Sequence, residues 1–286
     1  MLKTLNQKTK PIVIESIPTH SDPKGQSGRL GKSALAYSNL STFLSLSACD
    51  PINSPVVVLA SNSQDANLNL PQNYNIPYMV YLQSSPEPCV GSLIHPEWVL
   101  TAAHCPLPNK IRLGVYQPSI PTKKEQRRDH SVIMRHPDFQ AHTLNHDLML
   151  IKLSKAATMN SYVGTIAIAL EPMSFNDSCF IPTWTWNNYK NFSDPEVLAW
   201  IHQHSLPFIE CQEALLQKST GNFMCVGQPL KVSSKVKEVS AALAVCSGRL
   251  HGILSWAKGS VTLGSEAFFT EVHPYARWIM NIISTH

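Results

Sequence analysis

The sequence has little glycine, little charge and no long apolar run. Of its 286 residues only 12 are glycine, against 21 proline, while charged residues make up 15% and hydrophobic residues 43%. No stretch approaches the roughly 18 uninterrupted apolar residues of a membrane-spanning helix, so we expect no membrane span. The net charge of +4 is too small to imply a nucleic-acid partner. The most basic run, 123–130, is interrupted by acids and is predicted to be a solvated loop.

The amino terminus lacks the pattern of a secretory signal peptide. No run of about 7–15 apolar residues follows the basic start, so we expect the true first segment to be missing or replaced by unrelated sequence. Residues 1–72 are rich in Ser, Asn, Pro and Lys and have weak periodicity. We therefore predict that 1–72 is disordered or a non-native extension, and that 73–286 is the folded domain.

The number of cysteines is typical of a disulfide-bonded protein from an oxidising compartment, but it is odd, so one cysteine has no partner within the chain. The seven cysteines are Cys49, Cys89, Cys105, Cys179, Cys211, Cys225 and Cys246. An odd count leaves one of them unpaired. Three glycosylation sequons, which begin at Asn39, Asn176 and Asn191, add weight to a secreted protein.

Short apolar runs dominate the chain from Pro77 onward. They are β-branched or aromatic, are bounded by Pro, Asn and Ser, and recur about every 8–15 residues in two similar halves. This rhythm predicts antiparallel strands in a sandwich or barrel. Two segments differ: 209–219 is a short helix candidate, and 274–285 carries one apolar helical stripe after its proline. That stripe consists of Trp278, Ile279, Ile282 and Ile283.

Three residues form a candidate catalytic constellation. His104 ends the run Leu-Thr-Ala-Ala-His, Asp147 precedes a hydrophobic strand, and Ser240 follows much later. The order His, Asp, Ser is one of the known chain orders of a catalytic triad. A serine hydroxyl needs an imidazole to take its proton and a buried carboxylate to orient that imidazole. Taken singly, the same residues are more simply a core histidine, a turn aspartate and an ordinary serine.

With these residues and the cysteines in register, the sequence resembles the chymotrypsin-like serine proteases, or trypsin family. The resemblance runs from about Ile76 to the C-terminus and is nearest to the serine protease 58 type, which similarly carries Lys-Glu-Val-Ser-Ala-Ala around its serine. It implies an all-β fold of two packed antiparallel six-stranded β-barrels with a C-terminal helix and the site between the barrels. It also implies the disulfides Cys89–Cys105, Cys179–Cys246 and Cys211–Cys225.

The family motif Gly-Asp-Ser-Gly-Gly-Pro is degraded here to the sequence at 238–243. Glu238 replaces a glycine whose N–H belongs to the oxyanion hole, so that Glu238 and Ser240 would supply a degraded hole, and a side chain at this position adds negative charge. We expect the Glu238 amide to turn away from the hole. Val239 replaces the aspartate that pairs with a freshly cut amino terminus in the family. No Arg or Lys followed by Ile-Val-Gly-Gly precedes Ile76.

The implied specificity pocket is altered as well. Ser234 stands where trypsins carry the aspartate that binds Arg or Lys, and Ala257 and Ala267 stand where glycines keep the pocket walls open. Val236 and Ser260 occupy the two positions of a missing fourth disulfide.

Other supports of the site are retained. Ser255 holds the position of the serine that hydrogen-bonds the triad aspartate in the family, and Trp256 follows it in the pocket wall.

These features predict a secreted pseudoprotease that binds proteins such as protease inhibitors or active proteases. The alternative is a weak serine endopeptidase that uses His104, Asp147 and Ser240 and prefers small or modest apolar side chains. We expect no cofactor and no metal, since the cysteines are better used in disulfides. His202 and His204 share one face of a strand and could chelate a metal, but histidines on surface strands are common.

Overall fold

The computed structural model describes residues 75–174, 177–190, 193–206, 211, 222–227 and 236–286. Several predictions concern positions outside these ranges and stay predictions. They are the disordered or non-native segment 1–72, the helix over 209–219, the roles of Cys49 and Ser234, and the sequons at Asn39, Asn176 and Asn191.

The first half of the domain forms a seven-stranded antiparallel sheet in the order β5-β4-β1-β2-β3-β7-β6. Its strands are β1 (Met79–Gln83), β2 (Cys89–His95), β3 (Trp98–Thr101), β4 (Lys110–Leu113), β5 (Gln126–Arg128), β6 (His130–Arg135) and β7 (Met149–Leu153).

The sheet has seven strands instead of the expected six because one segment is divided at Asp129. β5 pairs with β4 and β6 pairs with β7, so the segment changes partner at Asp129 and closes the sheet into a barrel. Part of the basic run 123–130 therefore forms β5, and the prediction of a solvated loop was wrong for that part. The side chain of Glu125 in the same run is only 1% exposed.

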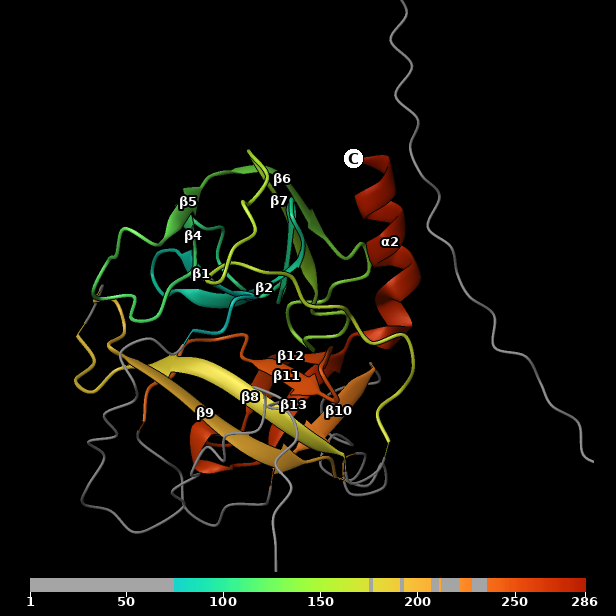
Figure 1. The fold of residues 1–286 in the computed structure, drawn as a ribbon. Helices are drawn as coiled ribbons and strands as arrows, with labels where there is room; N and C mark the ends of the chain where they lie inside the picture. Colours follow the sequence, from blue (N-terminus) through green and yellow to red (C-terminus); the bar gives the residue numbers. More distant parts are fainter. Residues whose placement is uncertain (1–74, 175–176, 191–192, 207–210, 212–221, 228–235) are drawn as a thin grey trace, which may run out of the picture. The chain divides into compact units, whose positions relative to one another are not determined.

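The second half forms a six-stranded antiparallel sheet in the order β10-β13-β12-β11-β8-β9 (Figure 1). Its strands are β8 (Ser178–Thr185), β9 (Val197–His204), β10 (Phe223–Val226), β11 (Leu243–Cys246), β12 (Arg249–Ala257) and β13 (Ala267–Glu271). A bridge between Ser205 and Val226 brings the ends of the outer strands β9 and β10 together. The two sheets confirm the predicted all-β fold.

The C-terminal helix α2 (Ala276–Thr285) follows a 3-10 turn over His273–Tyr275 and lies beside the first sheet (Figure 1). Ile279 and Ile282 are buried in the main hydrophobic core, against which Trp278 and Ile283 pack. The predicted apolar stripe is therefore the face that docks the helix, since burial of such a face is what stabilises a short helix.

Three disulfides join the cysteine pairs that the resemblance implies. They are Cys89–Cys105, Cys179–Cys246 and Cys211–Cys225. The first lies beside the histidine of the candidate site, and the second ties β8 to β11.

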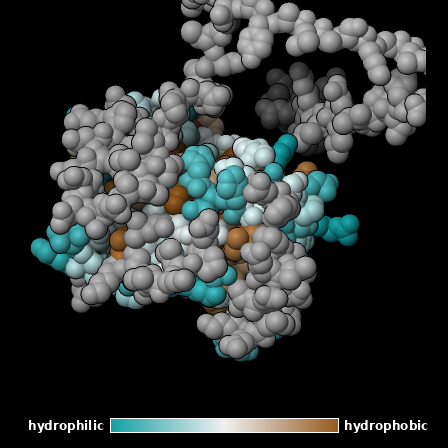
Figure 2. Space-filling model, turned by 90° about the horizontal axis from the view of Figure 1, so that it is seen from below, coloured by the Kyte–Doolittle hydropathy of each residue, from teal (hydrophilic) through white to brown (hydrophobic). Residues whose placement is uncertain are grey.

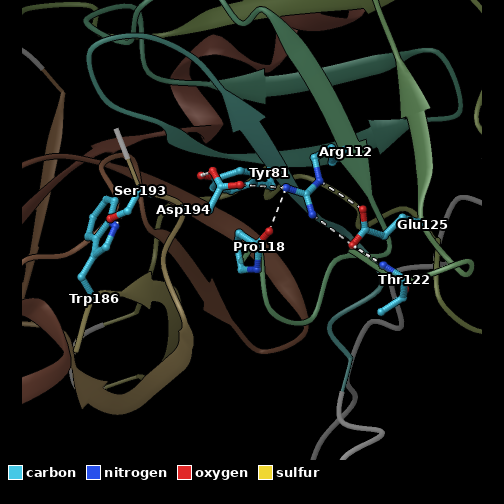
Figure 3. Close-up of polar contacts among 8 residues, drawn as sticks. All are labelled: Tyr81, Arg112, Pro118, Thr122, Glu125, Trp186, Ser193 and Asp194. Atoms are coloured by element: carbon cyan, nitrogen blue, oxygen red, sulfur yellow. Dashed lines mark hydrogen bonds and ion pairs between the residues drawn. The ribbon is translucent and has the colours of Figure 1, made fainter. Parts of the chain in front are cut away.

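A buried ion network links the two halves of the domain (Figure 3). Arg112 of β4 is 3% exposed and donates to both carboxylate oxygens of Glu125 at 3.1 Å, and to the Pro118 carbonyl at 2.9 Å. Its guanidinium also contacts Asp194, in the β8–β9 connection, at 3.4 Å, and the Tyr81 hydroxyl donates to the same carboxylate at 2.7 Å. Burial and the Asp194 hydrogen bond raise the pKa of Tyr81. The network thus connects β1 and β4 of the first sheet to the β8–β9 connection of the second half.

The surface carries scattered apolar groups. Figure 2 shows one face of the molecule, on which brown atoms form separate small groups between teal and pale ones. Isolated apolar side chains of this kind are ordinary on folded proteins. Within the described ranges, no helix has the length and apolar character needed to cross a membrane.

Candidate functional site

Antiparallel pairing of β3 with β7 brings His104 and Asp147 together. Thr101 pairs with Met149. His104, three residues after the end of β3, and Asp147, two residues before the start of β7, therefore meet at one end of the first barrel. Asp147 is fully buried and accepts hydrogen bonds from the His104 backbone N–H at 2.8 Å and from the Ser255 hydroxyl at 2.7 Å. Its other contact is with the Nδ1 of His104 at 2.6 Å. This contact holds the imidazole with Nδ1 protonated and Nε2 free to accept a proton.

Ser240 comes from the second half and faces the same space as His104. Both line a cavity of about 220 Å³ between the barrels. The carbonyl of Ser240 accepts a hydrogen bond of 2.8 Å from the Val90 N–H, which fixes its backbone to β2. The next residue, Ala241, has a left-handed φ of +63° and is fully buried. A non-glycine residue pays steric strain in this conformation, and the sequence has alanine where the family has glycine.

The cavity gathers most of the predicted site residues. Its lining is His104, Val236, Glu238, Val239, Ser240, Ala241, Leu254, Ser255, Trp256, Ala257, Gly259 and Val261. Two chain segments form its walls: 236–241 and 254–261. Ala267 pairs with Ala257 across β12 and β13 and is fully buried behind that wall. The volume is below the roughly 300–1,000 Å³ of typical ligand pockets.

The Glu238 side chain joins the two walls. Its carboxylate accepts hydrogen bonds from the Ser260 hydroxyl at 2.8 Å, the Val261 N–H at 2.8 Å and the Thr262 N–H at 2.9 Å. The Thr262 hydroxyl is a fourth donor. We call this arrangement the Glu238 bridge. It fixes a carboxylate at the cavity, two residues before Ser240.

The bridge takes over the connection that the missing fourth disulfide would make. Ser260 occupies one half-cystine position, and its hydroxyl contacts Glu238 instead of a sulfur at residue 236. The same two segments are therefore tied by charge-assisted hydrogen bonds. Sequence reasoning predicted a charge at Glu238 but not the donors that bind it.

The side chain of Val239 is buried among apolar residues, and both of its backbone polar groups are hydrogen-bonded. Its side chain is 1% exposed and belongs to the main core. Its N–H donates to the Trp184 carbonyl at 2.8 Å, and its own carbonyl accepts from the Thr183 hydroxyl at 3.0 Å. Glu238 lies opposite Thr185 in the same ladder, with its own N–H directed away from β8. The orientation of that amide relative to an oxyanion stays a prediction.

A histidine pair packs behind Asp147. The rings of His136 and His146 stack with centroids 5.0 Å apart, and the Tyr275 hydroxyl lies 3.0 Å from His146 Nδ1. Trp278 of α2 packs edge-on against His136. Burial, with a smaller effect of His146, lowers the pKa of His136. The helix thus supports the turn that presents the candidate carboxylate.

Metal-ligating side chains come together once, within the described ranges, at Cys89, His104 and Cys105. Both sulfurs belong to a disulfide, so they are not thiolate ligands. His202 and His204 are exposed on β9, where His202 packs against Phe180 with ring centroids 5.3 Å apart.

Comparison with known proteins agrees with this geometry. The family model described as Trypsin matches residues 68–279. The chain belongs to the trypsin family. Among its relatives, "Serine protease 58" of Homo sapiens is 37% identical over 213 residues, which cover 73% of this chain and 88% of that protein. "Probable inactive serine protease 58" of Bos taurus is also 37% identical, over 73% of this chain and 88% of its own length. "Trypsin I-P1" of Gallus gallus is 36% identical over 73% and 85%.

Next to its trypsin-family cleft, the chain has contacts that the sequence did not reveal. Lys237 pairs with Glu87, and Tyr189 contacts both residues. The adjacent charges of Lys237 and Glu238 in an extended segment do signal two separate partners, because neighbouring side chains of a strand point to opposite sides. The identity of those partners depends on residues that are distant in the sequence.

Proposed function

We propose that this trypsin-family chain is a secreted pseudoprotease that acts by binding proteins instead of cleaving them. The Glu238 bridge is the observation that carries the proposal. In the family, the residue at this position supplies an N–H to the developing oxyanion, and loss of one such donor lowers turnover by about 10²–10³. Here a carboxylate is anchored at that position by three hydrogen bonds of 2.8–2.9 Å. It adds a fixed negative charge close to the place where negative charge must form.

The pocket and the activation switch support the same proposal. The cavity of about 220 Å³ is small, and Ala257 lines it in place of a glycine. Val239 is seated among apolar core residues, an environment in which an unpaired amino-terminal cation would be costly. A domain of this kind keeps the protein-sized cleft of its family as a binding surface, for protease inhibitors or for active proteases.

Reaction with a fluorophosphonate probe tests the proposal. The purified full-length protein is incubated with the probe and, separately, with peptide 4-nitroanilides, and the Ser240→Ala variant serves as the blank. We expect labelling and hydrolysis at less than about 10⁻³ of the rate of an active trypsin, because one lost oxyanion donor lowers the rate by about 10²–10³ and the nearby carboxylate lowers it further. Labelling of Ser240 at a rate similar to that of trypsin contradicts the proposal.

The second candidate is a weak serine endopeptidase. Its support is the network around Asp147, which binds His104 at 2.6 Å and Ser255 at 2.7 Å as a working triad requires. In this case Ser240 is the nucleophile, His104 the base and Asp147 the group that orients the base. Labelling that disappears in Ser240→Ala and is faster than about 10⁻³ of the trypsin rate, together with hydrolysis of the peptide 4-nitroanilides, distinguishes this candidate from the pseudoprotease. Mass spectrometry of the native amino terminus tests secretion and trimming.

A further inference from the structure

Three chain segments meet beside Ser240 on the side away from the cavity. The Lys237 ammonium contacts both carboxylate oxygens of Glu87, at 2.8 and 2.9 Å. The Tyr189 hydroxyl donates to Glu87 at 3.3 Å, and the Lys237 ammonium lies 5.3 Å from the centre of the Tyr189 ring. We call these three residues the clasp. It connects the first barrel, the β8–β9 connection and the segment before Ser240.

The clasp and the Glu238 bridge lie on opposite sides of one extended segment. Glu238 pairs with Thr185 as part of a ladder, and successive side chains of such a segment point to opposite faces. Glu238 reaches the 260–262 wall of the cavity, whereas Lys237 reaches Glu87 of the first barrel. The clasp is therefore on the far side of the segment from the pocket.

Short chain distances keep the clasp close to Ser240. Glu87 precedes Cys89 by two residues, and the backbone of Cys89 pairs with that of Ser240 in a single parallel β-bridge. Cys89 is also disulfide-bonded to Cys105, the neighbour of His104. We expect a polypeptide that places one side chain in the cavity and its next peptide bond at Ser240 to leave the site past the segment 237–240, from which Lys237 of the clasp projects.

Trp186 supports the clasp from one side, and the three clasp side chains are partly exposed to solvent. The Trp186 ring packs edge-on against Tyr189 at 5.3 Å, and the Trp186 indole N–H donates to the Ser193 carbonyl at 2.8 Å. The side chains of Glu87 and Lys237 are each 37% exposed, and Tyr189 is 43% exposed. The three side chains thus stand at the mouth of the cleft instead of being buried within a barrel.

We propose that the clasp is a specificity-determining element that closes the cleft beyond Ser240 to a continuous polypeptide. A bound segment then ends at Ser240 instead of passing through, so the cleft receives chain ends and excludes extended inhibitory loops. This inference rests on the proposed function and narrows it: of the proposed partners, the cleft takes polypeptides that present a chain end, and it does not take protease inhibitors that present a continuous loop.

A Kunitz-type inhibitor tests the clasp, because its binding loop continues on both sides of the bond presented to Ser240. The version used has alanine at the residue that enters the small pocket. Binding is measured by surface plasmon resonance in a Glu238→Gly background, where the carboxylate no longer spans the cavity walls. Clasp variants Glu87→Ala and Tyr189→Ala then open the far side from two different segments.

We expect each clasp variant to bind the inhibitor at least about 10-fold more tightly, a change of about 1.4 kcal/mol. The matched control is Lys110→Ala, which removes another exposed ion pair, with Asp129 at 2.6 Å, and leaves affinity unchanged. Thermal melting checks that each variant folds. Tyr189→Ala, which removes the clasp side chain of a different segment, carries the test if Glu87→Ala does not fold.

Three results overturn the inference. The clasp variants bind the inhibitor with unchanged affinity, they do not bind it at all, or Lys110→Ala increases the affinity as much as they do. Its failure is separable from that of the proposed function. Rapid hydrolysis by the unmodified protein contradicts the pseudoprotease proposal without altering the affinity ratio. An unchanged ratio removes the clasp inference and leaves the labelling result intact.

Discussion

Replacement of Glu238 by glycine is expected to lower stability and raise reactivity at the same time. The bridge carboxylate accepts hydrogen bonds from Ser260, Val261 and Thr262 at 2.8–2.9 Å, and Ser260 and Val261 are 2% exposed. Hydrogen bonds to a charged group contribute about 1.5–3 kcal/mol each when buried, but water can enter this cavity and replace part of them. We expect a net loss of about 2–3 kcal/mol in the free energy of unfolding.

The reactivity of Ser240 should change in the opposite direction. Two like charges about 7 Å apart, at an effective dielectric constant of about 20, repel each other by about 2 kcal/mol. We expect a repulsion of this order between the Glu238 carboxylate and a forming oxyanion, which corresponds to about 30-fold in rate. Glycine also removes the side chain that restricts the backbone of the oxyanion donor. Glu238→Gly should therefore increase fluorophosphonate labelling of Ser240 by at least about 30-fold.

Two measurements on the same samples decide the matter. Differential scanning fluorimetry reports the stability change, for which 1 kcal/mol corresponds to about 2–4 °C in a domain of this size. Gel-based labelling reports the rate, with Glu238→Gly/Ser240→Ala as the blank. Glu238→Gln is the matched variant, since it removes the charge and keeps the side-chain volume. A melting temperature that does not fall shows that the bridge does not stabilise the walls, and an unchanged labelling rate refutes the electrostatic argument.

Three further predictions address other parts of the domain. Arg112→Met leaves the Glu125 carboxylate buried without its partner and should cost about 3–5 kcal/mol, whereas pairing it with Glu125→Leu should recover most of this in chemical denaturation. Because burial lowers the pKa of His136, the unfolded chain binds the proton first as pH falls below about 6.5. Stability should therefore fall between pH 7 and 5, and His136→Gln should reduce this slope in thermal melts. Ala241→Gly relieves a φ of +63° and should raise stability by up to about 1 kcal/mol, whereas Ala242→Gly, the buried neighbouring control, should lower it; equal losses would contradict the strain argument.

Local sequence patterns were enough to predict most of the strands and the C-terminal helix. Alternating apolar runs predicted the strands, and the stripe that includes Ile279 and Ile282 predicted the C-terminal helix, because strand and helix periodicity are local properties. The strand count of the first barrel was wrong by one. The change of pairing partner at Asp129 depends on barrel closure, which no short pattern encodes.

The sequence by itself determined which chemical groups are present: a His–Asp–Ser set, cysteines for three disulfides, and a glutamate, a valine and alanines in the motif around Ser240. Only the tertiary structure decided where the charges go. Lys237 and Glu238 are neighbours in the chain, yet one binds Glu87, 150 residues away, and the other binds Ser260, 22 residues away. Electrostatic partners are set by distance in space and by shared burial, and both arise only when the two barrels close around the cleft.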